Sequence, residues 1–461
     1  MHACLLSDVH LYSVLEKMTN RVVTSGRRSL SDERSEQRKP DSAECTCSRI
    51  EKFFGKPAFL KKLASISFLL AVFLILFFRN TRMFIYPEPW VEDMLIFLPH
   101  EYFIGFPKTA FMTYQGYIHL LPRMIAWISL KFGLQHAMVA MNWTVLFIKI
   151  MIFYLIYRSE EIRSPVIKFS LLAYLILVPF GDEIYNNVTN LQWWLIPLMM
   201  FIILRQESNR AAFLFDICLL VLCGLTGVNS ILFVAPCAYL FYKLRTKQCL
   251  IKGEIMLACA CIQFRCLAES VRVGGLSYDG GVVNLIHMFV NRVIYHTFFK
   301  FDYVGYLNLF VFCIYMLTVL FNLYYYRKNI TVKFVVLFSA VFTASIFYAM
   351  MKEQFGPLEN DIRGFGSDRY FVLLRAGSFV LLVSSLNILL RFLFGRKNYK
   401  KIMVYLCFLL CLALVKNYGI KDFYTFQYYD DIQKFESAEI GEKVRIHYAP
   451  EPPERYIDLT K

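Results

Sequence analysis

Long, nearly uninterrupted runs of apolar residues recur along most of this chain. Eleven of them fit membrane-spanning helices, at about 63–78, 137–157, 166–180, 191–204, 211–226, 229–242, 253–266, 303–326, 333–349, 370–394 and 402–416. Barrel strands are excluded because apolar and polar residues do not alternate within the runs. Several runs are shorter than the ~20 residues of a full crossing, so their ends are approximate. The pattern predicts an all-α integral membrane protein with about 11 transmembrane helices.

The polar connections between the runs predict an orientation. Residues 1–62 form a basic, largely disordered tail that the positive-inside rule places in the cytoplasm. Every connection that then faces the cytoplasm carries Lys or Arg: 158–165, 205–210, 243–252, 327–332 and 395–401. The polytopic domain covers 63–416, its large first external loop covers 79–136, and an external C-terminal tail covers 417–461. Residues 118–133 are expected to lie in the outer interface, because prolyl and basic residues interrupt their apolar pattern.

Composition indicates a membrane protein and argues against a nucleic-acid-binding protein and a disulfide-rich protein. Hydrophobic residues make up 57% of the 461 positions and charged residues 18%, whereas soluble proteins carry about 25% charged residues. The net charge of +15 follows from basic residues beside apolar runs, so no nucleic-acid partner is expected. Most of the 13 cysteines lie in or beside apolar runs, where cysteine acts as a small hydrophobe.

The first external loop carries an acidic pair, Glu92 and Asp93, among aromatic residues. A carboxylate beside the membrane can act as a general base toward a sugar hydroxyl. It can also hold a divalent cation that bridges a phosphate leaving group, and two adjacent carboxylates do not decide whether a metal is needed. The alternative is an ordinary solvated acidic loop.

A second candidate segment in the same loop contains Tyr114, Gln115, His119 and Arg123. At helical spacing His119 and Arg123 are four residues apart and share a face. An imidazole and a guanidinium that project together would suit a phosphate or pyrophosphate group. The alternative is that Arg123 reaches lipid headgroups while His119 makes an interfacial hydrogen bond.

The next candidate is the external turn 181–194. Asp182, Glu183, Asn187 and Asn190 lead into Trp193 and its neighbouring tryptophan. Carboxylates and amides hydrogen-bond to hydroxyl groups, and an indole stacks on a pyranose ring, so this turn is typical of a carbohydrate-binding lip. The alternative is an aromatic belt at the membrane interface.

A third external loop and one intramembrane charge complete the candidates. Arg363 and Arg369 flank a glycine-containing stretch and would clamp a lipid-linked phosphate, unless the loop is simply salt-bridged. Asp216 lies within a predicted span, where ionisable residues are costly and often functional. It favours a transporter, unless it reaches water or Arg210 at the cytoplasmic end.

Five short motifs resemble those of one family. They are WVED at 90–93, YQGYIHLLPR at 114–123, NVTNLQW at 187–193, GLTG at 224–227 and DRY at 368–370. Together with a cytoplasmic start, one span and a large external loop, they resemble the GT-C class of polytopic glycosyltransferases, in particular bacterial envelope members. The resemblance covers 63–416 in topology but only these motifs in sequence.

The resemblance implies an activity. A sugar would pass, with inversion, from a polyprenyl-phosphate-linked donor to an O-antigen-like or lipopolysaccharide glycan on the outer face of the cell inner membrane. Asp93 or Glu92 would be the base or cation holder, supported by the other carboxylate, and the lipid phosphate would contact Arg123, Arg363 or Arg369. Two alternatives stay open: a polysaccharide polymerase, and a lipid-linked oligosaccharide flippase or other transporter.

Overall fold

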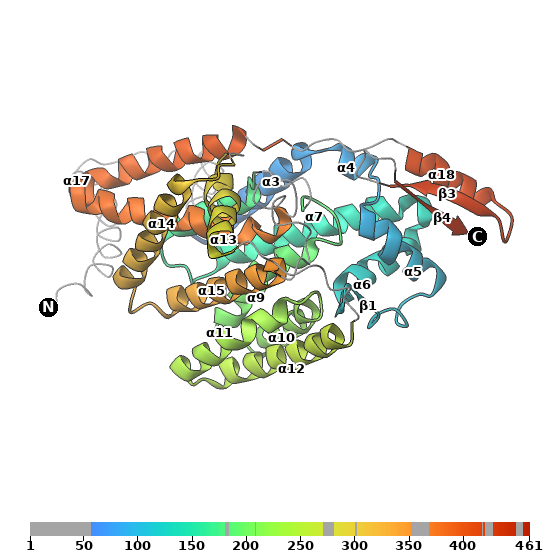
Figure 1. The fold of residues 1–461 in the computed structure, drawn as a ribbon, viewed down its shortest axis with the longest axis horizontal. Helices are drawn as coiled ribbons and strands as arrows, with labels where there is room; N and C mark the ends of the chain where they lie inside the picture. Colours follow the sequence, from blue (N-terminus) through green and yellow to red (C-terminus); the bar gives the residue numbers. More distant parts are fainter. Residues whose placement is uncertain are drawn as a thin grey trace, which may run out of the picture. The chain divides into compact units, whose positions relative to one another are not determined.

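A computed structural model describes most of the chain beyond its N-terminal tail. The described residues are 57–179, 184–207, 209–270, 281–299, 302–351, 368–416, 418–419, 427–448 and 455–461. Residues 66–461 form one compact unit, distinct from residues 1–65. This unit is mostly helical and carries two small hairpins (Figure 1).

Five helical segments are long and apolar enough to cross a membrane, counting the described residues alone. They are Phe59–Arg79 within α3 (Pro57–Arg79), Leu134–Arg158 (α7), Tyr306–Tyr325 (α14), Ile330–Tyr348 within α15 (Ile330–Met351) and Val372–Gly395 within α17 (Val372–Lys416). This is the pattern of a multi-pass membrane protein. The other predicted spans also coincide with helices, which are shorter or less apolar: α8 (Pro165–Ile176), α9 (Leu191–Leu204), α10 (Arg210–Gly224), α11 (Asn229–Leu244) and α12 (Lys247–Glu269).

The predicted spans 370–394 and 402–416 correspond to the two parts of α17. The helix breaks at Gly395, whose φ of 64° lies in the left-handed region that glycine adopts without a steric penalty. The two apolar runs are therefore two helices that follow one another directly and change direction at Gly395.

Local sequence explains where several helices begin. The Ser164 hydroxyl accepts a hydrogen bond from the Ile167 amide, 3.5 Å away, and a proline follows at the first position of α8. The Asn209 side chain caps α10 through the Ala211 amide at 2.8 Å. Thr246 does the same for α12.

The segment between α3 and α7 is a series of short elements. After α4 (Arg82–Ile85) come the π-helix η1 (Asp93–Phe97), α5 (Leu98–Phe103), the strands β1 (Thr113–Tyr114) and β2 (Tyr117–Ile118), α6 (Leu120–Ser129) and the 3₁₀ turn η2 (Leu130–Phe132). The 10 residues of α6 are too few to cross a bilayer. The sequence did not predict either the π-helix or the hairpin.

The remaining elements lie after α12. They are α13 (Gly281–Phe289), η3 (Val290–Ile294), η4 (Tyr295–Thr297), η5 (Asp368–Tyr370), α18 (Gln427–Ser437), β3 (Lys443–His447) and β4 (Tyr456–Thr460). Strands β3 and β4 pair antiparallel, with Lys443 opposite Thr460 and His447 opposite Tyr456. The stretch 417–461, predicted as a tail, therefore contains a helix and a hairpin, which lie beside α5 (Figure 1).

Candidate functional site

Asp93 is the centre of the candidate site. It is the first residue of η1, and its side chain is fully buried. Its carboxylate accepts hydrogen bonds from the Val188 amide at 3.2 Å, the Thr189 amide at 3.0 Å and the Thr189 hydroxyl at 2.6 Å. The loop before α9 is thereby joined to the first loop across 96 residues of sequence.

Burial raises the pKa of Asp93 to about 7. The hydrogen bond from the Thr189 hydroxyl opposes this rise, and the neighbouring charge of Glu92 adds to it. A buried carboxyl that titrates near neutral pH is typical of functional sites. Both oxygens of Asp93 already have protein partners, however, and this favours a role in fixing the loop.

Glu92 presents the more accessible carboxylate. Its side chain is 15% exposed, its Oε1 lies 3.8 Å from Nη1 of Arg369, and its buried Oε2 has no hydrogen-bond partner among the described residues. Arg369 lies over the Tyr370 ring, 5.1 Å from its centroid, and Tyr370 meets Trp193 edge-to-face at 5.0 Å. Three segments that are distant in sequence thus meet beside Glu92.

The hairpin β1–β2 brings Tyr114 and His119 to this region. The charges of Glu92 and Arg369 both act on the Tyr114 hydroxyl, although burial is the main cause of its raised pKa. Gln115 forms the hairpin turn with the glycine that follows it, both at positive φ, and its amide donates to the Tyr114 hydroxyl at 3.4 Å. Gln115 therefore shapes the turn.

His119 is buried among aromatic rings. Its ring centroid lies 4.5 Å from that of Tyr117, 5.4 Å from Phe97 and 5.9 Å from Tyr114. Neither ring nitrogen makes a hydrogen bond of good geometry to a described residue. Burial, helped by the charge of Arg123, lowers the pKa of His119 to about 3. The imidazole is therefore neutral at pH 7 and can accept or donate one hydrogen bond.

The expected shared helical face of His119 and Arg123 is wrong. His119 precedes α6 with φ −120° and ψ 61°, outside helical geometry, whereas Arg123 lies in the first turn. The fully buried Arg123 pairs with Glu101 at 3.6 Å and donates from Nε to the Met112 carbonyl at 3.2 Å. A guanidinium engaged in this way holds the loop together and is not open to a phosphate.

The described part of the turn before α9, residues 184–190, is buried and does not form an exposed lip. The Asn187 side chain accepts from the Asn190 amide at 2.8 Å, and the Trp194 indole donates to the Ile184 carbonyl at 3.0 Å. Trp193 packs on Tyr370. Asp182, Glu183 and Arg363 lie outside the described residues.

Two of the sequence motifs pair through their main chains. The Gly227 amide donates to the Ile118 carbonyl at 2.9 Å, and the Leu120 amide donates to the Leu225 carbonyl at 3.1 Å. Gln263 of α12 brackets Ile118, accepting from its amide at 2.8 Å and donating to its carbonyl at 3.2 Å. We call residues 118–120 and 225–227 the main-chain seam.

Sequence reasoning missed two residues that build the site. Thr189, which holds Asp93 through both amide and hydroxyl, lay inside the NVTNLQW motif but was not singled out. Gln263 lies in an apolar run of the sequence. A single amide side chain in such a run indicates a buried hydrogen bond, and this could have identified Gln263.

Asp216 has different partners from the one expected. It pairs with Arg205 and with Lys252, whose Nζ lies 3.3 Å from Oδ2. Lys252 also donates to the Ile202 and Arg205 carbonyls, each at 2.6 Å, at the end of α9. Asp216 is therefore neutralised by Arg205 and Lys252, and not by Arg210 as expected.

No protein-family model, curated protein or solved structure matches this chain. Among the described residues, no group of three or more His, Cys, Asp or Glu side chains is placed to hold a metal ion. The geometry itself offers two adjacent carboxylates, an arginine facing one of them and a neutral imidazole in the same loop. Such groups can take up a proton from a hydroxyl and stabilise a developing anion.

Proposed function

We propose that this chain is a multi-pass membrane glycosyltransferase of the GT-C type. It would transfer a sugar from a polyprenyl-phosphate-linked donor to an envelope glycan at the outer face of the cytoplasmic membrane. The observation that carries the proposal is the convergence of two of the family-like motifs on the carboxylate pair of a third. Asp93 binds the backbone of the NVTNLQW motif, and Glu92 faces Arg369 of the DRY motif.

The geometry favours different roles for the two carboxylates. Asp93 fixes the loop, because both of its oxygens accept protein hydrogen bonds. The Glu92 side chain is partly exposed, and its buried Oε2 has no partner among the described residues, so Glu92 is the better base. Glu92 would take the proton of the acceptor hydroxyl as that oxygen attacks the anomeric carbon. The bond from that carbon to the phosphate oxygen breaks, and its electron pair leaves with the phosphate.

Arg369 is placed to stabilise the leaving phosphate. Its side chain is 24% exposed, and its guanidinium approaches Glu92 at 3.8 Å without close bidentate geometry. A phosphate offers stronger, shorter hydrogen bonds to a guanidinium than this carboxylate does at that distance. Arg369 can therefore exchange Glu92 for the phosphate, and this exchange would also free Glu92 to act as the base.

The proposal includes the topology predicted from the sequence. About eleven spans would place residues 79–136 and Arg369 on the outer side and the basic tail 1–62 inside. Asp216, one of the charges that would favour a transporter, pairs with Arg205 and Lys252, and this pairing argues against that alternative. No observation specifically favours a polymerase.

The test compares carboxylate variants at equal membrane abundance. Glu92→Gln and Asp93→Asn should each abolish the sugar modification, measured by mass spectrometry of the envelope glycan. Glu160→Gln is the matched control, because Glu160 is exposed in a different connection. Full modification by the Glu92→Gln variant would refute the assignment of the base. A change in glycan chain length without loss of a branch sugar would indicate a polymerase.

A further inference from the structure

Residues after α17 form a small folded module. The C-terminal module consists of α18, β3 and β4, and its helix is fastened to its hairpin by Asp431. The Asp431 carboxylate accepts from the His447 amide at 3.1 Å and lies 2.6 Å from the His447 ring nitrogen. Ile432, Phe435 and Ile446 are fully buried in its apolar face.

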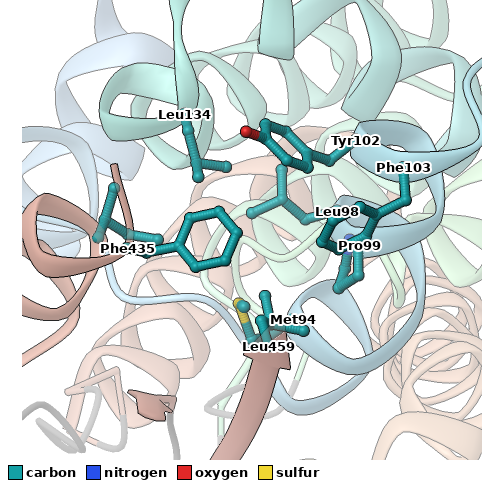
Figure 2. Close-up of a pocket in the computed structure, with 9 residues that line it drawn as sticks. Met94, Leu98, Pro99, Tyr102, Phe103, Leu134, Phe435 and Leu459 are labelled. Carbon is teal, nitrogen blue, oxygen red and sulfur yellow. The ribbon is translucent and has the colours of Figure 1, made fainter. Parts of the chain in front are cut away.

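This apolar face packs on the segment that carries the acidic pair. Ile432, Phe435 and Leu459 line one apolar space together with Met94, Leu98, Pro99, Tyr102, Phe103 and Leu134. Figure 2 shows the Phe435 ring pointing into this space between α18 and α5. The Phe435 and Tyr102 rings meet edge-to-face at 5.9 Å.

A second contact lies on the other side of the acidic pair. Tyr429 of α18 meets Tyr86 edge-to-face, with ring centroids 6.2 Å apart. The module therefore contacts the chain before Glu92, at Tyr86, and after Asp93, at Tyr102, and it lines one apolar space with Met94 and Leu98.

The local structure between these contacts needs external support. The residues Asp93–Phe97 form a π-helix, a rare geometry that occurs mostly as single turns inside α-helices and frequently at functional sites. Met94, the residue after Asp93, is buried in the space that the module closes. Removing the module's side chains would uncover Met94 and Leu98 and leave the π-turn without packing on this side.

We propose that the C-terminal module positions Asp93: the packing of Phe435 and Ile432 on Met94 and Leu98 holds η1 in place, so that Asp93 meets the Val188 and Thr189 amides. Phe435 is a positioning residue that acts through Met94 and Leu98. The catalytic consequence of this positioning rests on the proposed function, but the positioning itself does not.

Amide hydrogen exchange of the full-length protein in detergent tests this proposal without a substrate. In the Phe435→Ala variant, a peptide containing Val188 and Thr189 should exchange faster by about tenfold, because these amides lose their acceptor when η1 loosens. Asp93→Asn defines the exchange expected when the acceptor is altered directly. Phe435→Leu should restore slow exchange. Ile440→Ala, on an exposed side chain of the same module, should leave exchange at the wild-type rate.

Each outcome decides the matter. Unchanged exchange at 188–189, with faster exchange of Lys443–His447 in the module itself, would overturn the proposal. If Phe435→Ala does not fold, Leu459→Ala supplies a milder loss of the same packing, with the same expected direction. Faster exchange in Phe435→Ala together with full glycan modification by Glu92→Gln would support positioning while refuting the proposed function. Inactive carboxylate variants with unchanged exchange in Phe435→Ala would do the reverse.

Discussion

The pH dependence of stability tests the environment of Asp93. Burial raises the pKa of this carboxyl from 3.8 to about 7 in the folded protein. The folded state therefore holds this proton more tightly than the unfolded state does. The resulting stabilisation is fully present below about pH 4 and is lost as the pH rises through about 7. Asp93→Asn removes the titrating group, so the variant should not show this loss.

The magnitude follows from the size of the rise. Each pKa unit corresponds to about 1.4 kcal/mol, so a rise from 3.8 to about 7 corresponds to about 4 kcal/mol of unfolding free energy. Between about pH 4.5 and 8, wild type should lose up to this amount relative to Asp93→Asn. The variant also carries a constant cost of about 1–3 kcal/mol, because its side-chain NH₂ cannot accept from the Val188 or Thr189 donors.

The assay is thermal unfolding of the detergent-solubilised full chain, followed by tryptophan fluorescence at several pH values. The difference in midpoint between wild type and Asp93→Asn should shrink or reverse as the pH rises. Glu160→Gln is the matched control, since Glu160 is exposed in a different connection. Parallel profiles for wild type and Asp93→Asn would refute the reasoning, since they would mean that the three hydrogen bonds outweigh burial and keep Asp93 ionised throughout.

Two further predictions concern the loop and the seam. Glu101→Ala should lower the unfolding free energy by about 3–5 kcal/mol, because it leaves the buried Arg123 without its carboxylate; adding Arg123→Met should recover part of the thermal midpoint, and no recovery would contradict the pairing. Gly227→Ala should lower the unfolding free energy of the protein by about 1–3 kcal/mol more than Gly133→Ala does. Both glycines have φ near +90°, but a Cβ at Gly227 would lie 2.1 Å from the Gln192 side chain while one at Gly133 meets nothing within 4 Å. Equal midpoints for the two glycine variants would show that this close approach is relieved at little cost.

The helices could be predicted from the sequence because their signal is local. Apolar runs such as 191–204 and 229–242 coincide with α9 and α11 within two residues. Within the part of the chain that the structure describes, length and apolar character support a crossing for five helices, and the prediction of about eleven spans goes beyond them. Short apolar runs do not distinguish a span from a buried helix.

The sequence predicted several residues of the candidate site, but it did not predict most of their contacts. Glu92, Asp93 and Arg369 were chosen for their chemical types, and the structure brings them together. The engagement of Arg123 by Glu101 and of Asp93 by Thr189 could not be read from spacing, because such contacts depend on how distant segments pack. The hairpin β3–β4 did leave a local signal in the alternation of KVRIH at 443–447, where Val444 and Ile446 are buried.

The main-chain seam has a practical consequence for mutagenesis. Its two bonds join amides to carbonyls, so truncating the side chain of Ile118, Leu120 or Leu225 to alanine leaves both bonds intact. An alanine scan of these three positions would therefore report lost side-chain packing and not the connection between the hairpin and the turn between α10 and α11. Replacing the Leu120 amide by an ester, or by proline, removes one donor and would reveal how much the connection contributes.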